Sequence, residues 1–164
     1  MKTAITKNVL KALEKDSRLT AEKIATMTGH SVADVREAIR GAEKERIILK
    51  YKTVINWDKM GREEVSALIE VKVVPQRAVG FDVVAQRIYR FPEARSVYLV
   101  SGTYDLLVQV TGRTIQEVAT FVTEKLATLD FVQGTVTHFM LKRFKEDGEV
   151  LDGQEELERL PISL

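Results

Sequence analysis

The sequence predicts an α+β protein in two parts, a helical N-terminal part and a C-terminal part of the order β-α-β-β-α-β. Apolar residues recur at helical spacing through about the first 45 residues. β-Branched runs alternate with helical patterns between residues 65 and 141, and a turn-rich segment at 56–61 separates the two patterns. We expect a winged helix-turn-helix domain in residues 1–60, a sheet domain in 61–145 and a tail in 146–164.

The composition fits one or two small domains with apolar cores, because 45% of the 164 residues are hydrophobic and 30% are charged. The chain has no cysteine, which excludes disulfides and cysteine-based metal sites, and we expect no metal or cofactor. No run of about 18 apolar residues is present, and residues 1–8 lack the apolar core of a signal peptide. A cytoplasmic protein without membrane contact is expected.

The net charge of +1 conceals an asymmetry between the two parts. Residues 1–60 carry 13 Lys and Arg against 8 Asp and Glu, whereas residues 61–164 carry 12 against 16. A balance of +5 in the first part suits a polyanionic partner such as DNA. A split of this size also arises by chance, so it does not by itself indicate DNA binding.

Two helices are expected before residue 30. The first has one apolar face at spacings i, i+4, i+7 and i+8, formed by Ile5, Val9, Ala12 and Leu13. Thr20 is the expected N-cap of the second helix, and Gly29 is expected just after its last residue. The residues expected to point inward from the second helix are Ile24, Ala25 and Met27.

A third helix is expected from Ser31, which with Asp34 forms an S-x-x-D cap. Its buried stripe is expected to contain Val35, Ala38, Ile39 and Ala42. Two helices joined by a short glycine-containing turn form a helix-turn-helix, which places the start of its second helix in the DNA major groove. Ala33, Arg36, Glu37 and Arg40 face outward there, and the candidate DNA contacts are Ser31, Ala33, Arg36 and Arg40. A plain three-helix bundle with solvated charges is the alternative.

A β-branched run at 47–55 is expected to form a strand, and the C-terminal part follows it. Strands are expected at 65–74, at 97–110 as a hairpin, and at 132–141, with helices at 81–90 and after the T-x-x-E box that begins at Thr114. The expected inner face of the second helix is Ile115, Val118, Phe121, Val122, Leu126 and the stem of Lys125. This order is the ferredoxin-like pattern. Because both helices cover one face of its sheet, we expect a second copy to cover the other face in a homodimer.

The turn of the hairpin, residues 101–105, holds a glycine, a threonine, a tyrosine and an aspartate. Its backbone N–H groups and its one carboxylate suit the carboxylate and ammonium groups of a free amino acid. A plain β-turn with Gly102 in a left-handed conformation is the alternative.

Several motifs together resemble the Lrp/AsnC family of transcription regulators over about residues 4–145. They are Asp16–Thr20 before the second helix, Phe91–Ala94, Val100–Asp105, and Thr135-Val136-Thr137 on the last strand. The resemblance implies a dimer built through the C-terminal sheets, often assembled to octamers, and amino-acid effectors bound between dimers. The implied effector-binding residues are Gly102, Thr103, Tyr104, Asp105, Thr135 and Thr137. The chain departs from the family pattern at Ala38, Ala42 and Arg46, where the family usually has Arg, Leu and Gly.

The resulting expectation is a sequence-specific regulator that binds double-stranded DNA and responds to an amino acid or similar small molecule, and not an enzyme. Two alternatives remain. One is a tetrapyrrole decarboxylase of the Lrp-like type, with His138, Arg95 and Arg143 as candidate residues. The other is an architectural DNA-binding protein without an effector.

Overall fold

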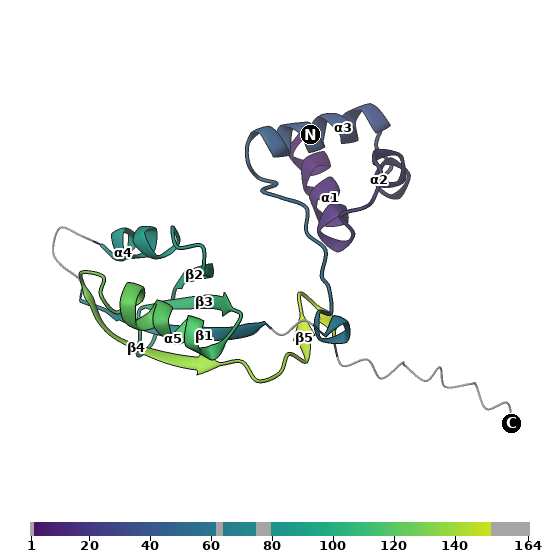
Figure 1. Cartoon of the computed structure of the whole chain (residues 1–164). Coiled ribbons are helices and arrows are strands. Elements are labelled where there is room, and N and C mark those ends of the chain that lie inside the picture. The colour runs from purple at the N-terminus through teal and green to yellow at the C-terminus, as the bar shows by residue number, and fades with distance from the viewer. Residues whose placement is uncertain (1, 62–63, 75–79, 152–164) are drawn as a thin grey trace, which may run out of the picture. The chain divides into compact units, whose positions relative to one another are not determined.

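The computed structural model describes residues 2–61, 64–74 and 80–151, and the chain separates into two compact units, Met1–Ile55 and Asn56–Leu164 (Figure 1). The division lies between residues 55 and 56. The three-part division with boundaries at 60/61 and 145/146 stays a prediction, and residues 152–164 of the expected tail lie outside the described residues. Within the described ranges, no helix is both long enough and apolar enough to cross a membrane.

The first unit contains the three expected helices, α1 (Lys2–Lys15), α2 (Ala21–Thr28) and α3 (Val32–Lys44). Their core is built from residues that the apolar periodicity marks, among them Val9, Leu13, Ile24 and Val35. The expected caps are confirmed, since Thr20 Oγ1 accepts the N–H of Lys23 at 3.3 Å and Gly29 has φ +72°. The inward orientation expected for Met27 is wrong, because this side chain is 65% exposed.

The strand expected over residues 47–55 does not form. Arg46 adopts a left-handed φ of +56°, and the N–H groups of Ile47 and Ile48 both donate to the Ala42 carbonyl, at 2.8 and 3.1 Å. The chain then runs without ladder hydrogen bonds as far as a short 3₁₀ helix, η1 (Asp58–Met60). A strand needs a neighbour for its backbone groups, and no described segment supplies one here.

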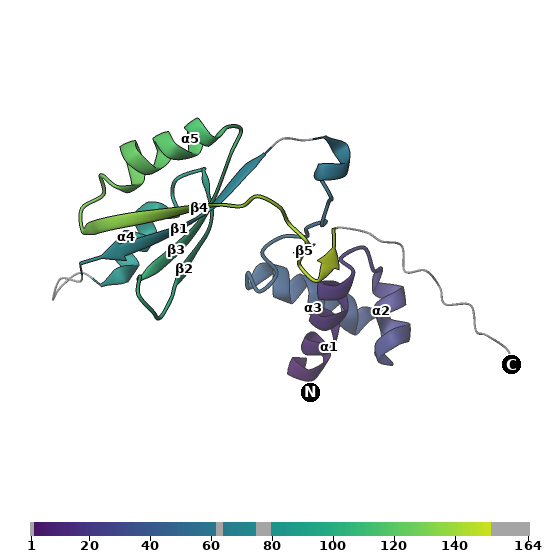
Figure 2. The ribbon, with the colours of Figure 1, turned by 90° about the horizontal axis from the view of Figure 1, so that it is seen from below.

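The second unit is a four-stranded antiparallel sheet with the order β2-β3-β1-β4, which is the ferredoxin-like arrangement (Figure 2). The elements follow the expected order, although the strand at 65–74, the helix at 81–90 and the strand at 132–141 end one or two residues early, and the hairpin extends beyond 97–110 at both ends. They are β1 (Val65–Val73), α4 (Phe81–Ile88), β2 (Ala94–Leu99), β3 (Leu106–Gly112), α5 (Ile115–Thr120) with its π-helical continuation η2 (Phe121–Leu126), and β4 (Val132–Phe139).

Both helices of this unit cover the same face of the sheet. One buried cluster contains Ile69 and Val108 from the strands, Ile88 from α4, and Phe121 and Leu126 from η2. The expected inner face of α5 is therefore confirmed for its buried residues. Ile115 is an exception and is 55% exposed. Side chains tilt toward the helix N-terminus, so this first residue of α5 points off the end of the helix.

The T-x-x-E box at the start of α5 is confirmed. Thr114 Oγ1 accepts the N–H of Glu117 at 3.1 Å, and Glu117 Oε2 accepts the N–H of Arg113 at 2.7 Å. Beyond β4, a hairpin of β5 (Lys145–Glu146) and β6 (Glu149–Val150) forms a sheet of its own. Asn56 Nδ2 donates to the Leu151 carbonyl at 2.8 Å, which ties this hairpin to the start of the second unit.

Candidate DNA-binding helix and effector site

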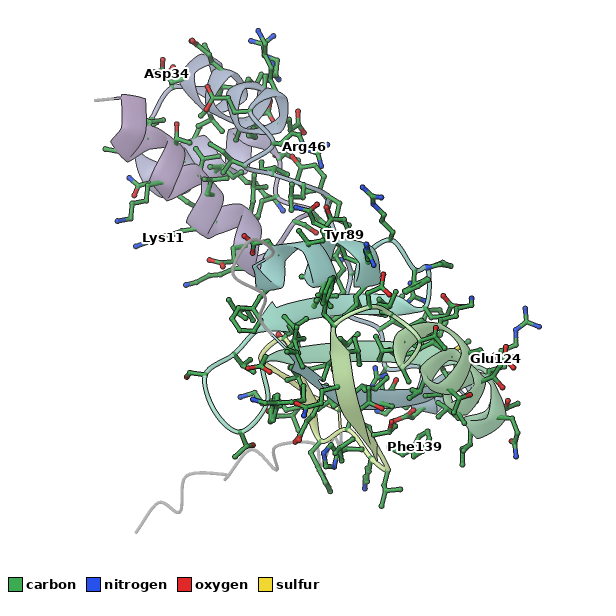
Figure 3. All side chains as sticks on the ribbon, turned by 90° about the vertical axis from the view of Figure 1, so that its left-hand side faces the viewer. Lys11, Asp34, Arg46, Tyr89, Glu124 and Phe139 are labelled. Atoms are coloured by element: carbon green, nitrogen blue, oxygen red, sulfur yellow. The ribbon has the colours of Figure 1, made fainter. Side chains whose placement is uncertain are left out.

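The N-terminus of α3 is fixed by its cap. Ser31 Oγ accepts the N–H of Asp34 at 3.1 Å and donates to Asp34 Oδ2 at 2.7 Å. Asp34 is exposed at the surface of the first unit (Figure 3). The hydroxyl of Ser31 is thus engaged in capping. The other predicted contacts, Ala33, Arg36 and Arg40, are all exposed on the same helix.

Arg36 and Arg40 differ in their surroundings. Arg36 Nη2 lies 2.5 Å from Glu22 Oε1 of α2, and both side chains are more than half exposed. The backbone N–H of Glu22, the Thr20 hydroxyl and Arg36 hold the pKa of the Glu22 carboxyl below its ordinary value. Arg40 has no ion-pair partner among residues 2–61. Arg40 is therefore free to contact an anion, whereas Arg36 must exchange Glu22 for it.

The turn between β2 and β3 is closed by backbone hydrogen bonds. The N–H of Val100 donates to the Asp105 carbonyl at 2.9 Å, and the N–H of Asp105 donates to Val71 at 3.1 Å. Gly102 has φ +150°, and both it and Thr103 are exposed, whereas Tyr104 and Asp105 are half-buried.

The carboxylate of Asp105 already has partners within the chain. Asp105 Oδ2 accepts the N–H of Val73 at 2.9 Å, and Lys72 Nζ lies 3.3 Å from Oδ1 and 3.2 Å from Oδ2. The Val73 N–H, and then Lys72, hold the pKa of Asp105 below its ordinary value. The ladder between β1 and β3 ends at the pair Val71–Leu106, so the N–H of Val73 lies beyond its last pair, where the Asp105 carboxylate accepts it.

The two predicted threonines lie on β4, across β1 from the turn. Thr135 is paired with Val71 and Thr137 with Ile69, so both hydroxyls share the helix-covered face with those buried residues. Val71 pairs on its other side with Leu106, next to Asp105. The turn and Thr135 are thus at the same end of the sheet, about 10 Å apart across β1 at the usual strand spacing. Lys72 was not predicted from the sequence, and no local pattern marks it.

No described helix of the second unit covers the other face of the sheet. Tyr98 of β2 and Val136 of β4 are 52% and 53% exposed there, in one row with Leu107 and Glu70. His138 is in the next row, and its Nε2 lies 3.1 Å from Glu70 Oε1. The side chains of this row are mostly apolar, which is typical of a surface that another protein covers.

The residues of the decarboxylase alternative each have a protein partner. His138 contacts Glu70, Arg143 donates to Ser66 Oγ, and Arg95 Nε donates to Thr111 Oγ1 at 2.8 Å. In the described parts of the chain, no group of three or more His, Asp or Glu side chains is placed to hold a metal ion.

Comparison with known proteins decides the family. The sequence model of the "Lrp/AsnC ligand binding domain" matches residues 66–150. The HTH-type transcriptional regulator YugG of Bacillus subtilis is 48% identical over 156 residues, which cover 94% of each chain. The chain belongs to the Lrp/AsnC family. Its relatives are transcriptional regulators rather than enzymes, so this Lrp/AsnC chain is a regulator, and the decarboxylase alternative is not retained.

Solved Lrp/AsnC structures share the fold. The leucine response regulatory protein LrpA of Mycobacterium tuberculosis has a TM-score of 0.73 at 22% identity and covers 90% of this chain and 97% of its own. The regulator NMB0573 of Neisseria meningitidis, solved as a complex with L-Met, has a TM-score of 0.68 at 20% identity and covers 87% of this chain and 91% of its own. These likenesses confirm the predicted α+β fold class.

Proposed function

We propose that this Lrp/AsnC chain is a cytoplasmic homodimer that binds specific duplex DNA through α3 and responds to an amino acid. The observation that carries the proposal is the capped α2–turn–α3 unit, which presents Arg36 and Arg40 on one outward face. An arginine there can form a bidentate contact with guanine or an ion pair with phosphate. The +5 balance of residues 1–60 favours the same partner.

The test is DNA binding by the full chain, with a duplex selected from a randomised pool and fluorescence anisotropy as the readout. Arg40→Ala should lower affinity by roughly 1–3 kcal/mol if Arg40 contacts a base. Arg36→Ala should lower the affinity less than Arg40→Ala does, because Arg36 of the wild type must give up its pairing with Glu22 to contact DNA. Lys11→Ala on α1 is the matched control, since it removes one exposed charge from another helix of the same unit. Equal affinities of the Arg36→Ala/Arg40→Ala double variant and the wild type would exclude α3 as the recognition helix.

The proposed effector site consists of the turn residues Gly102, Thr103, Tyr104 and Asp105 with Thr135 and Thr137. Backbone N–H groups of the exposed turn would take the ligand carboxylate. Support for an amino acid comes from the L-Met complex of NMB0573, a structural neighbour. Asp105 binds Val73 and Lys72 in the free chain, so a ligand ammonium would share its carboxylate with Lys72 or displace it.

Calorimetric titration with the twenty amino acids, preceded by a thermal-shift screen, tests this part of the proposal. A true effector stabilises the protein in a dose-dependent way. Thr135→Val and Thr137→Val keep the side-chain shape and remove the hydroxyls, and each should weaken binding of the effector found. Unchanged binding in both variants would place the site elsewhere.

The uncovered sheet face supports the homodimer. Its apolar row, together with the absence of any described helix over it, gives a second copy a surface to cover. Assembly of dimers to octamers remains part of the proposal, and a ligand can drive it only by binding one assembly more tightly than another.

A further inference from the structure

A cleft lies at the other end of β3 from the proposed effector turn. It has a volume of about 380 Å³ and opens between the end of β3, the α5–η2 helix and Glu93, which precedes β2. Gly112 is part of its wall, and a Cβ at this position would come within 3.1 Å of Val118 Cγ2. The volume is in the range of small-molecule sites.

The two oxygens of Glu93 are satisfied unequally. Lys125 Nζ lies 2.6 Å from Oε1, and this pairing holds the pKa of the Glu93 carboxyl below its ordinary value. Oε2 is shielded from solvent and has no hydrogen-bond donor among the described residues. A buried carboxylate oxygen without a donor is costly and uncommon in proteins, so it calls for a partner.

Lys125 is a replaceable partner. Its side chain is 44% exposed and its flexible four-carbon stem can turn away from Glu93 into solvent. As a point charge it holds one oxygen, whereas a planar guanidinium donates two parallel N–H groups to both oxygens of a carboxylate. A guanidinium in its place would satisfy the oxygen that Lys125 leaves unpaired.

The rest of the cleft fits a cation with a short apolar part. Its charged lining residues are two carboxylates, Glu93 and Glu117, and one ammonium, Lys125. The side chains of Gln116 and Thr120 also line it, and neither makes a hydrogen bond within the described residues. Val118 and Phe121 supply apolar wall. Two polar side chains without a hydrogen bond in the described part of the chain, those of Gln116 and Thr120, thus border a region whose charged lining residues sum to one negative charge.

We propose that this cleft is a second ligand site, which binds a small molecule with a guanidinium group by displacing Lys125 from Glu93. The site is separate from the effector turn, because Gly112 and Leu106 are at opposite ends of β3. Binding there would hold α5 against the sheet and the loop before β2.

The probe is n-butylguanidinium, with n-butylurea as its neutral counterpart of similar shape, titrated into the full chain at low ionic strength by calorimetry. We expect n-butylguanidinium to bind at least about ten-fold more tightly than n-butylurea, since the fork to Glu93 is charge-assisted. Glu93→Gln should weaken n-butylguanidinium binding by about ten-fold or more. Lys125→Met should strengthen it, because the competing ammonium is gone and the apolar stem is kept.

The control is Glu124→Gln, which makes the same change on the solvent-facing side of η2 and should leave binding unchanged (Figure 3). If the Lys125–Glu93 ion pair is purely structural, Lys125→Met should not bind n-butylguanidinium more tightly than the wild type does. This variant therefore tests the proposal even if Glu93→Gln folds poorly. The proposal is overturned if neither the wild type nor Lys125→Met binds the probe at millimolar concentration. Equal binding of n-butylurea, or equal affinity of Lys125→Met and the wild type, would also overturn it.

Discussion

Replacement of Asp105 tests whether its carboxylate stabilises the fold in the absence of a ligand. In the structure its carboxylate accepts the N–H of buried Val73 and pairs with half-exposed Lys72. Asp105→Ala leaves the Val73 N–H without an acceptor, which costs about 1–3 kcal/mol. The ion pair with Lys72 is partly screened by solvent and adds at most about 0.5–1 kcal/mol. We expect a total loss of about 1–4 kcal/mol.

Asp105→Asn is the matched comparison, because its amide oxygen can still accept from Val73 while the charge is lost. We expect this variant to lose about 1 kcal/mol, the difference between a charge-assisted and a neutral hydrogen bond. Urea unfolding at one fixed protein concentration measures both losses, since the stability of an oligomer depends on concentration. At an ordinary m-value, Asp105→Ala should lower the midpoint by about 1 M urea.

The pH dependence gives a second measure. Folding lowers the pKa of Asp105 below the ordinary value of 3.8, so its ionised form stabilises the fold. This stabilisation is fully present above the unfolded pKa and is lost as the pH falls through the folded pKa. The difference between wild type and Asp105→Asn should therefore be largest near pH 7 and shrink below about pH 4. A stability of Asp105→Ala within about 0.5 kcal/mol of wild type at pH 7 would refute the structural role.

Three further predictions use other contacts. Glu22→Gln should raise DNA affinity about two- to ten-fold, because it releases Arg36 and removes a charge that repels phosphate. Glu14→Gln on α1 is the control, and equal DNA affinities of the two variants in fluorescence anisotropy would contradict this role of Glu22. Gly112→Ala should cost about 1–3 kcal/mol in urea unfolding, because its Cβ would crowd Val118; an undiminished midpoint would show that α5 moves aside. Val136→Asp, on the uncovered sheet face, should weaken the dimer in light scattering, whereas Thr123→Asp on the exposed side of η2 should not; equal masses would exclude that face as the interface.

Local patterns in the sequence predicted most of the elements and the N-termini of three helices. Thr20, Ser31 and Thr114 cap helices as predicted, because a cap needs only a hydroxyl and an N–H three residues later. The spacing of apolar residues, which is also a local pattern, predicted the order β-α-β-β-α-β and most of the buried residues. The predicted strand at 47–55 is wrong because a ladder depends on a neighbour, which a local pattern does not supply.

The two-part α+β architecture, the outward face of α3 and the location of the polar turn could thus be predicted from the sequence alone. Which charged side chains are available for a ligand depends instead on how the elements pack. Packing pairs Arg36 with Glu22. It also pairs Lys72 with Asp105, which are 33 residues apart in the sequence, and Lys125 with Glu93, which are 32 residues apart. These pairs form because the packing of helices and strands brings distant residues within hydrogen-bond distance, and their order along the chain carries no sign of it.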